Sequence, residues 1–440
     1  MALWPPNSII GISEPAARTR PLPMRDMLLM ITGMSPQVIT ETLYAIAVSR
    51  QPWPERVVVM TTTKGADLLR RDMIDKGRLE SLCEQLHRPA FYPATFDIQV
   101  IHDAAGQPME DARTSADHEA MADFILETVR SLTADPATRV HASISGGRKT
   151  MSFYLGYAMS LFGRPQDVMT HVLVSEGYEG HPDFFFPTRH SCEISTRDGK
   201  TLDMKDAAVT LASIPFIRHR DELPQVYTVD KGRPPGFREL VELMDLANQP
   251  GRLGLRFDHS TGRLSILEDG RPVKELIFEK GLDWAWYLLV AEATAAGDGT
   301  LRRAETRDDG SYALGWRVMD VLGHRLGIHV DRHEDYKSLV RYWARQHEEA
   351  LERIGIIPDN FLKVMQGGFS GEAISGSSSR INQQLHRELP RALADWLRIG
   401  MFFDRSGRHH AEEKRAGGYG VRLPAEQILI VKGSSASGVA

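Results

Sequence analysis

The segment 139–151 combines a glycine turn with basic residues in a pattern that could bind an anion. It predicts a short apolar strand, a tight turn at Gly146 and Gly147, and the first turn of a helix. Glycine lets the backbone turn sharply and leaves room for a ligand against it. The first N–H groups of a helix lack partners, and the helix dipole favours negative charge beside them. The predicted anion-binding residues here are Ser145, Gly146, Gly147, Arg148, Lys149 and Thr150.

The basic residues of this segment are predicted at the start of a helix, where positive charge is unfavourable. Ser145 is expected to cap the helix, which would put Arg148, Lys149 and Thr150 in its first turn. Positive side chains at that end oppose the helix dipole and are unfavourable for the helix itself. A phosphate bound at this position would offset the unfavourable positive charge.

Two other predicted strands end in turns of the same residue types. The apolar run 27–31 and the run 57–60 are each followed by Ser, Thr and Gly, where Ser35 can cap a helix and Pro36 suits its first position. In a doubly wound parallel sheet, ligands bind beyond the carboxyl ends of the strands. These turns therefore add further predicted ligand-binding residues: Thr32, Gly33, Ser35, Pro36, Gln37, Thr61, Thr62 and Thr63.

The first half of the chain predicts an α/β fold with a mostly parallel, Rossmann-like sheet. Its apolar runs alternate with amphipathic helical segments, as expected of successive βαβ units. The stretch 211–217 is apolar but has no clear assignment. The predicted strands cover residues 27–31, 57–60, 97–101, 140–144 and 171–175.

The second half predicts an α+β domain. Strands at 253–257, 263–267 and 273–277 precede an apolar, Trp-rich helix over 278–295. Helices, the serines 377–379, a basic helix and a Gly-Tyr segment at 417–423 follow. This order resembles a winged helix interrupted by a helical insert of roughly 80 residues.

A chain of 440 residues is too long for one ordinary core, so at least two domains are expected. The Pro- and Gly-rich segment 230–236 is the clearest linker. The expected parts are a flexible extension 1–25, a ligand-binding domain 26–190, a connector 191–236, a winged-helix-like domain 237–430 and a disordered tail 431–440.

Composition narrows the class of protein. A hydrophobic content of 42% and a charged content of 25% are typical of a globular protein. The net charge of −5 gives no overall electrostatic case for binding nucleic acid. Two cysteines without disulfide or zinc spacing fit a reducing cytoplasm. The sequence has neither a signal-peptide layout nor a run long enough to span a membrane, so no membrane partner is expected.

Several enzyme classes lack their motifs in this sequence. It contains no G-x-x-x-x-G-K-[ST], no G-x-G-x-x-G after the first strand and no H-E-x-x-H or clustered ligands. Neither a cofactor nor a metal site is therefore expected. His102, His141 and His171 are interpreted as strand-end or core residues.

The turn motifs, in their order and spacing, resemble the CARF domains of type III CRISPR defence and, more narrowly, the ring nucleases. The resemblance covers roughly residues 26–190. It rests on TGMSPQ at 32–37 with ETLY at 41–44, Thr61 and Thr62, SGGRKTM at 145–151, and LGYAMSLFG at 155–163.

The resemblance implies a homodimer that binds cyclic tetra- or hexa-adenylate across its two-fold axis and cleaves it without metal. Attack of a ribose 2′-hydroxyl would give linear products ending in a 2′,3′-cyclic phosphate. Lys149 would stabilise the transition state, and Ser35 or Thr32 would orient the phosphate or the 2′-hydroxyl. Ser145 with the amides of the glycine turn would hold one phosphate, and Arg148 would pair with another.

Two other functions stay open at this point. One is a transcription regulator controlled by cyclic oligoadenylate, with the first domain as sensor. Its helix 379–389 would contact DNA through Arg380, Asn382, Gln383, Gln384 and Arg387. The other is a messenger-activated HEPN-type ribonuclease, marked by an Arg and a His with four to six residues between them. That motif occurs four times in unrelated contexts, which is close to chance. The four pairs are Arg113 with His118, Arg341 with His347, Arg380 with His386, and Arg405 with His410.

Overall fold

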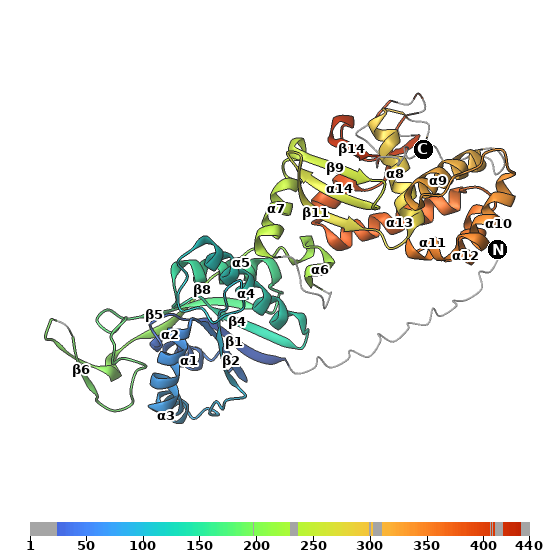
Figure 1. Ribbon diagram of the computed structural model, residues 1–440. Helices are drawn as coiled ribbons and strands as arrows, with labels where there is room; N and C mark the ends of the chain where they lie inside the picture. The colour runs from blue at the N-terminus through green and yellow to red at the C-terminus, as the bar shows by residue number, and fades with distance from the viewer. Residues whose placement is uncertain are drawn as a thin grey trace, which may run out of the picture. The chain divides into compact units, whose positions relative to one another are not determined.

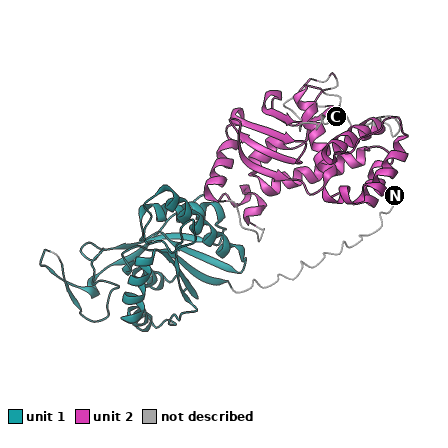
Figure 2. Cartoon of the chain, in the orientation of Figure 1, with its two compact units in different colours: residues 1–217 teal, residues 218–440 magenta. Residues whose placement is uncertain are grey.

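The computed structural model divides the chain into two compact units, residues 1–217 and 218–440 (Figure 2). It describes residues 24–196, 198–228, 236–298, 301, 310–404, 406, 408–409 and 417–432. The expected extension up to residue 23, the linker residues 230–235, the tail from 433 and the motif residues Arg405 and His410 lie outside the described residues.

The first unit is built on a six-stranded sheet with the order β3-β2-β1-β4-β5-β8. All neighbouring strands pair in parallel except β5 and β8, which are antiparallel. This confirms the expected α/β fold with a mostly parallel sheet. The strands are β1 (Arg25–Ile31), β2 (Arg56–Thr61), β3 (Phe96–Val100), β4 (Thr138–Ser143), β5 (Val168–Val174) and β8 (Val209–Ser213).

Helices cover both faces of this sheet, which explains the continuous apolar runs of its central strands. On one face, α1 (Gln37–Val48) packs against β5, β8 and α3 (Arg78–Leu86). On the other, α4 (Ser115–Ala134) packs against β4 and α5 (Lys149–Phe162) (Figure 1). Residues 28–31 of β1 are completely buried between these two layers.

Three further elements of the first unit lie outside this regular alternation. After β2, α2 (Thr63–Leu69) continues into a π-helical segment, Arg70–Asp75. The short strands β6 (Glu193–Ser195) and β7 (Thr201–Asp203) form a hairpin. The stretch 211–217, which had no assignment from sequence, begins within β8 and leaves the sheet after Ser213.

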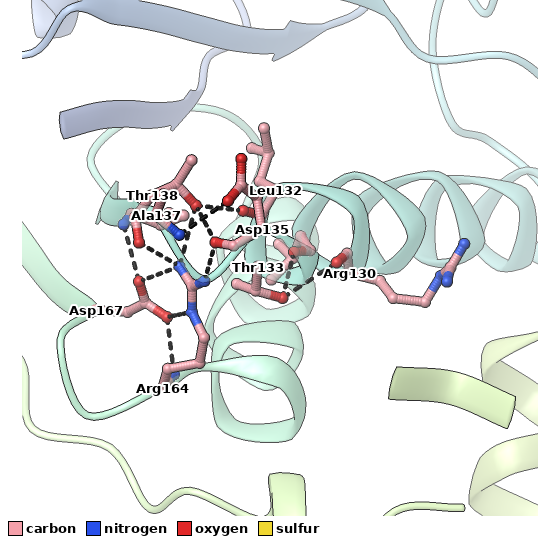
Figure 3. A network of polar contacts seen from close by, with 10 residues as sticks. Arg130, Leu132, Thr133, Asp135, Ala137, Thr138, Arg164 and Asp167 are labelled. Atoms are coloured by element: carbon pink, nitrogen blue, oxygen red, sulfur yellow. Dashed lines mark hydrogen bonds and ion pairs between the residues drawn. The ribbon is translucent and has the colours of Figure 1, made fainter. Parts of the chain in front are cut away.

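A buried network fixes the amino end of β4 (Figure 3). The Asp167 carboxylate accepts hydrogen bonds from the Val140 amide at 2.8 Å and from the Arg164 amide and guanidinium at 2.8–2.9 Å. The Arg164 guanidinium also donates to the carbonyls of Asp135 and Thr138. The Asp167 side chain is fully buried and that of Arg164 is 8% exposed, so the two charges compensate each other away from water.

The second unit contains a four-stranded sheet with the order β11-β10-β9-β14. Strand β10 is antiparallel to β9 and β11, and β14 is parallel to β9. A two-stranded sheet joins β12 (Gly400–Phe403) to β13 (Gly418–Gly420), which contains the Gly-Tyr segment. The four strands of the larger sheet are β9 (Leu253–Asp258), β10 (Arg263–Glu268), β11 (Arg271–Ile277) and β14 (Ile428–Val431).

The core of the second unit is centred on α8 (Gly281–Ala295), the expected Trp-rich helix. It is buried around most of its circumference, as its apolar sequence requires. It packs against α9 (Gly310–Leu326), α13 (Gly371–Glu388), β13 and β14. The other helices are α6 (Gln225–Thr228), α7 (Phe237–Ala247), α9 (Gly310–Leu326), α10 (Tyr336–Gln346), α11 (Glu348–Arg353), α12 (Pro358–Met365), α13 (Gly371–Glu388) and α14 (Arg391–Leu397).

The proposed recognition helix differs from its expectation. It is the second half of α13, which begins at Gly371 because the Ser370 hydroxyl accepts a hydrogen bond from the Ala373 amide. Arg380 pairs with the buried Asp283 of α8. Asn382 and Gln384 bond the backbone carbonyls of Ile399 and Ile277 at 3.0 and 2.8 Å. These three side chains are therefore engaged within the unit, and DNA contact through this helix stays a prediction.

The ribonuclease motif pairs that the structure describes lie in different settings. Arg341 is exposed on α10, and His347 follows this helix with its ring near Trp343. The pair of Arg380 and His386 lies on α13, where Arg380 forms an ion pair with Asp283. No helix among the described residues is both long and apolar enough to cross a membrane.

Asp167→Ala should strongly destabilise the first unit. The substitution leaves the Arg164 guanidinium buried without its carboxylate and the Val140 amide without an acceptor, a loss that costs about 3–5 kcal/mol. Denaturant unfolding compared with wild type measures the change. Lys200→Ala removes an exposed ion pair with Asp198 and should leave the unfolding midpoint unchanged. Equal midpoints for the two variants would contradict a stabilising role of the network.

Candidate ligand-binding site

The candidate site lies where the direction of chain progression across the sheet reverses. From β1 the chain proceeds outward to β2 and β3, and from β4 it proceeds to β5 in the opposite direction. The helices that follow β1 and β4 therefore lie on opposite faces of the sheet, which leaves a crevice at the carboxyl ends of the strands. A cavity of about 510 Å³ occupies this position, within the roughly 300–1,000 Å³ of small-molecule sites.

The turn between β1 and α1 is fixed by Thr32, which is completely buried. Its hydroxyl donates to the Ser35 carbonyl at 2.9 Å, and its own carbonyl accepts from the Thr61 hydroxyl at 2.7 Å. Thr32 thus shapes the turn without lining the cavity. Gly33, Ser35 and Gln37 do line it.

The start of α1 differs from the expectation. Pro36 precedes the helix instead of occupying its first position, and no side chain caps it. Ser35 is exposed at the cavity, and its hydroxyl makes no hydrogen bond to another described residue. The Ser35 hydroxyl is therefore available to a ligand.

The turn between β4 and α5 requires glycine at two successive positions. Gly146 has φ 105° and Gly147 has φ 71°, both in the left-handed region that other residues rarely adopt. A Cβ on Gly146 would also lie 2.9 Å from a methyl carbon of Val38 and 3.0 Å from the Ile31 carbonyl oxygen. Side chains are thus excluded where the β4 turn meets the beginning of α1.

Ser145 does not cap α5, contrary to the expectation. Gly146 and Gly147 have left-handed backbone conformations, so the helix begins only after them. Arg148 occupies the capping position, and Lys149 is the first helical residue. The Ser145 hydroxyl instead accepts from the Val172 amide at 2.6 Å and lies 3.0 Å from Nδ1 of His171. Ser145 therefore links the β4 turn to β5, and His171 reaches the cavity beside it.

Both turns present backbone N–H groups that have no acceptor among the described residues. Helix starts leave such groups unpaired, and here two helix starts meet at one cavity. Successive N–H groups at a helix start favour an anion. The groups belong to Gly33, Met34, Ser35, Gln37 and Val38 in the first turn, and to Gly146, Gly147, Arg148, Lys149 and Thr150 in the second.

The turn after β2 is mainly structural. The Thr61 hydroxyl is buried against the Thr32 carbonyl, and the Thr63 hydroxyl donates to the Met109 carbonyl at 3.2 Å. Thr62 caps α2 by accepting from the Gly65 amide at 3.4 Å, and it lines the cavity. Of the three threonines, only Thr62 lies at the site.

Two basic side chains line the cavity, and acidic residues already pair with both. Arg148 forms an ion pair with Asp111, and Lys64 forms one with Glu110 at 3.5 Å. Both acids belong to the segment between β3 and α4 and also line the cavity. Lys149 is exposed at the first position of α5 and does not line the cavity, so its assigned role stays a prediction.

The buried carboxyl group of Glu41 was missed by the sequence reasoning. Glu41 lies on α1, is only 4% exposed and lines the cavity. Burial, and secondarily the neighbouring charge of Glu179, raises the pKa of Glu41 to about 7. A single glutamate in a helical pattern gives no signal of burial. The burial arises because β5 and β8 both pack against α1.

The structure brings together only part of the predicted set. The predicted residues that line the cavity are Gly33, Ser35, Gln37, Thr62, Ser145, Gly146, Gly147 and Arg148. Those outside its lining are Thr32, Pro36, Thr61, Thr63, Lys149 and Thr150. Lining residues that were not predicted include Glu41, Lys64, Glu110, Asp111, His171 and Glu179.

Residues 35–242 match the family model of the CRISPR-associated protein NE0113. The matched segment is a little under half of the 440 residues, and it includes Ser35 and the whole β4–α5 turn. The match supports a CRISPR-associated role for the chain. No curated protein shows a significant match.

Glu41→Gln should make the protein more stable at pH 8 but not at pH 5. Because the pKa of Glu41 is raised on folding, the folded state holds this proton more tightly than the unfolded state. The ionisable wild type therefore loses stability as the pH rises from about 4.5 to about 7, by up to about 3 kcal/mol.

Denaturant unfolding of wild type and variant between pH 5 and pH 8 measures this difference. Glu84→Gln removes an exposed carboxylate from α3 and should follow the wild-type profile. A Glu41→Gln profile that also follows the wild type would show that Glu41 is already ionised in the folded protein at low pH.

Proposed function

We propose that the chain is a CRISPR-associated protein that binds cyclic oligoadenylate, with four or six adenylates, in the cavity at the carboxyl ends of β1 and β4. The observation that carries this proposal is the set of unpartnered backbone N–H groups from two neighbouring turns at one cavity. Such groups bind phosphate without requiring side chains. The family match supports the CRISPR context of the proposal.

A homodimer forms the complete site in this proposal. A cyclic oligoadenylate carries a ring of phosphates, and a two-fold dimer presents each glycine turn twice. Phe153, one helical turn after Lys149 on α5, is 61% exposed and lies 5.8–6.0 Å from the rings of Tyr154 and Tyr157. An interface through this aromatic surface would bring the two copies of Lys149 close together.

The proposed reaction is cleavage of the bound ring by its own ribose. The 2′-oxygen bonds to the adjacent phosphorus while the bond from phosphorus to the 5′-oxygen breaks. The 2′-hydroxyl loses its proton and the 5′-oxygen gains one, which gives a linear product with a 2′,3′-cyclic phosphate. Such a reaction depends on in-line positioning and on stabilising the charged transition state, and needs no metal.

Each residue has a definite part in this proposal. Lys149 stabilises the charge that develops on phosphorus, and the free Ser35 hydroxyl orients the phosphate or the 2′-hydroxyl. Arg148 binds a second phosphate after leaving Asp111. Thr32 acts indirectly, because its hydroxyl holds the turn that carries Ser35.

Lys149→Ala should abolish cleavage and weaken binding. Loss of one group that stabilises a transition-state oxyanion reduces the rate by about 100-fold or more. The assay incubates the protein with cyclic tetra- and hexa-adenylate in the presence of EDTA and separates the products by chromatography. Wild type should produce linear oligoadenylates.

Lys205→Ala provides the matched control, since Lys205 pairs with Asp203 and does not line the cavity. It should cleave like wild type. Cleavage by Lys149→Ala at the wild-type rate would refute the assignment of Lys149. Binding of the ring by wild type without cleavage would limit the function to sensing.

Phe153→Arg should convert the proposed dimer into single chains. A charged side chain at a buried apolar contact lacks a partner and opposes association. Light scattering after size-exclusion chromatography measures the mass, with Tyr92→Arg, another highly exposed aromatic of the first unit, as the control. A wild type with the mass of one chain would contradict the dimer, and an unchanged mass for Phe153→Arg would contradict this interface.

A further inference from the structure

Glu41 is the one buried acid of the cavity lining for which the described structure offers no counter-charge. The residue is only 4% exposed, and no hydrogen bond or ion pair joins its carboxyl group to another described residue. Burying a carboxyl group in this way is unfavourable unless something else satisfies it. A ligand in the cavity is in a position to do so.

The surroundings of Glu41 decide which part of a nucleotide it can meet. Apolar side chains of Val38, Met151, Val172 and Val174 line the same cavity. The charge of Glu179 also acts on Glu41 and raises its pKa, and this negative charge would repel a phosphate. The unpaired N–H groups that suit phosphate lie instead on the two turns, as does Arg148, and Lys64 lies at the start of α2. An apolar wall with one polar group suits the flat ring of a nucleobase.

We propose that protonated Glu41 is the nucleobase-binding residue of this site and pairs with the edge of an adenine. Its O–H donates to a ring nitrogen, N1 or N7, and its carbonyl oxygen accepts from the 6-amino group. This inference rests on the proposed function and adds to it a residue that recognises the base. The pairing satisfies both carboxyl oxygens at once.

The pairing depends on pH, because an ionised Glu41 has no proton to donate and would oppose the lone pair of the ring nitrogen. Burial and the charge of Glu179 keep the pKa of Glu41 near 7, so both forms exist around neutrality. The titratable or charged groups that share the cavity are Glu179, His171, Lys64, Arg148, Glu110 and Asp111. Of the elements packed against α1, β5 carries His171, α3 carries Arg78, Glu80, Cys83 and Glu84, and β8 carries none.

The test measures equilibrium binding of cyclic tetra- and hexa-adenylate between pH 6 and pH 8, with ring integrity checked by chromatography. For each Glu41 that pairs with the ring, wild type should bind about tenfold more weakly at pH 8 than at pH 6, because the protonated fraction of a group with a pKa near 7 falls about tenfold over that range. A ring held by both copies of Glu41 in the dimer should therefore bind up to about a hundredfold more weakly at pH 8. Glu41→Gln keeps a donor and an acceptor, so it should bind at both pH values with the wild-type affinity of pH 6. Glu41→Ala should bind weakly throughout.

Two further measurements separate base recognition from a structural effect. Glu179→Gln removes the repelling charge and should shift the midpoint of the wild-type pH profile downward while binding at pH 6 persists. A ring with dimethylated 6-amino groups cannot donate to Glu41, so wild type, Glu41→Gln and Glu41→Ala should bind it equally weakly.

The outcomes distinguish the two proposals. Failure of wild type to bind either ring at any pH refutes the proposed function. Normal binding with an unchanged pH profile in Glu41→Gln refutes the role of Glu41 and leaves the proposed function intact. Discrimination between the variants by the dimethylated ring would also refute pairing with the 6-amino group.

Discussion

The close approach of the β1–α1 and β4–α5 turns is the constraint on which the site depends. Parallel pairing of β1 with β4 brings the two turns together, and glycines allow the contact. A Cβ on Gly33 would lie 3.6 Å from Cα of Gly147, and one on Gly146 would meet the Ile31 carbonyl oxygen at 3.0 Å. Because no side chains intervene between the two turns, the backbone itself forms this part of the cavity wall. Binding can then rely on N–H groups whose positions are set by the sheet.

The two ends of β4 illustrate opposite treatments of polar groups. At its amino end, Arg164 and Asp167 satisfy one another and the surrounding backbone in a buried network. At its carboxyl end, successive amides and the carboxyl group of Glu41 have no partner among the described residues. Unsatisfied polar groups lower stability, and they are tolerated at sites that bind a ligand. The network at the amino end thus holds in place the strand whose carboxyl end leads into unpaired amides.

The sequence predicts those features of the fold that depend on neighbouring residues in the chain. Buried parallel strands appear as apolar runs, and their Gly, Ser and Thr turns mark the carboxyl ends, so the sheet and the glycine turn were predictable. The start of α5 was placed too early because the left-handed conformation of Gly146 and Gly147 cannot be read from residue types alone. Glu41 was missed for another reason: its burial depends on β5 and β8, which are far away in the sequence. The start of α13 was likewise set by Ser370, ahead of the more conspicuous serines 377–379.

The ion pairs of Arg148 with Asp111 and of Lys64 with Glu110 affect how any anion enters the cavity. An incoming phosphate finds these cations already neutralised and must take the place of a carboxylate. The number of ion pairs is then conserved on binding, and the displaced acids are released into solvent. Added salt weakens the pairs of the empty and the occupied site alike. The affinity of the cavity should therefore vary less with ionic strength than its count of basic residues suggests, and selectivity would come from the geometry of the backbone donors.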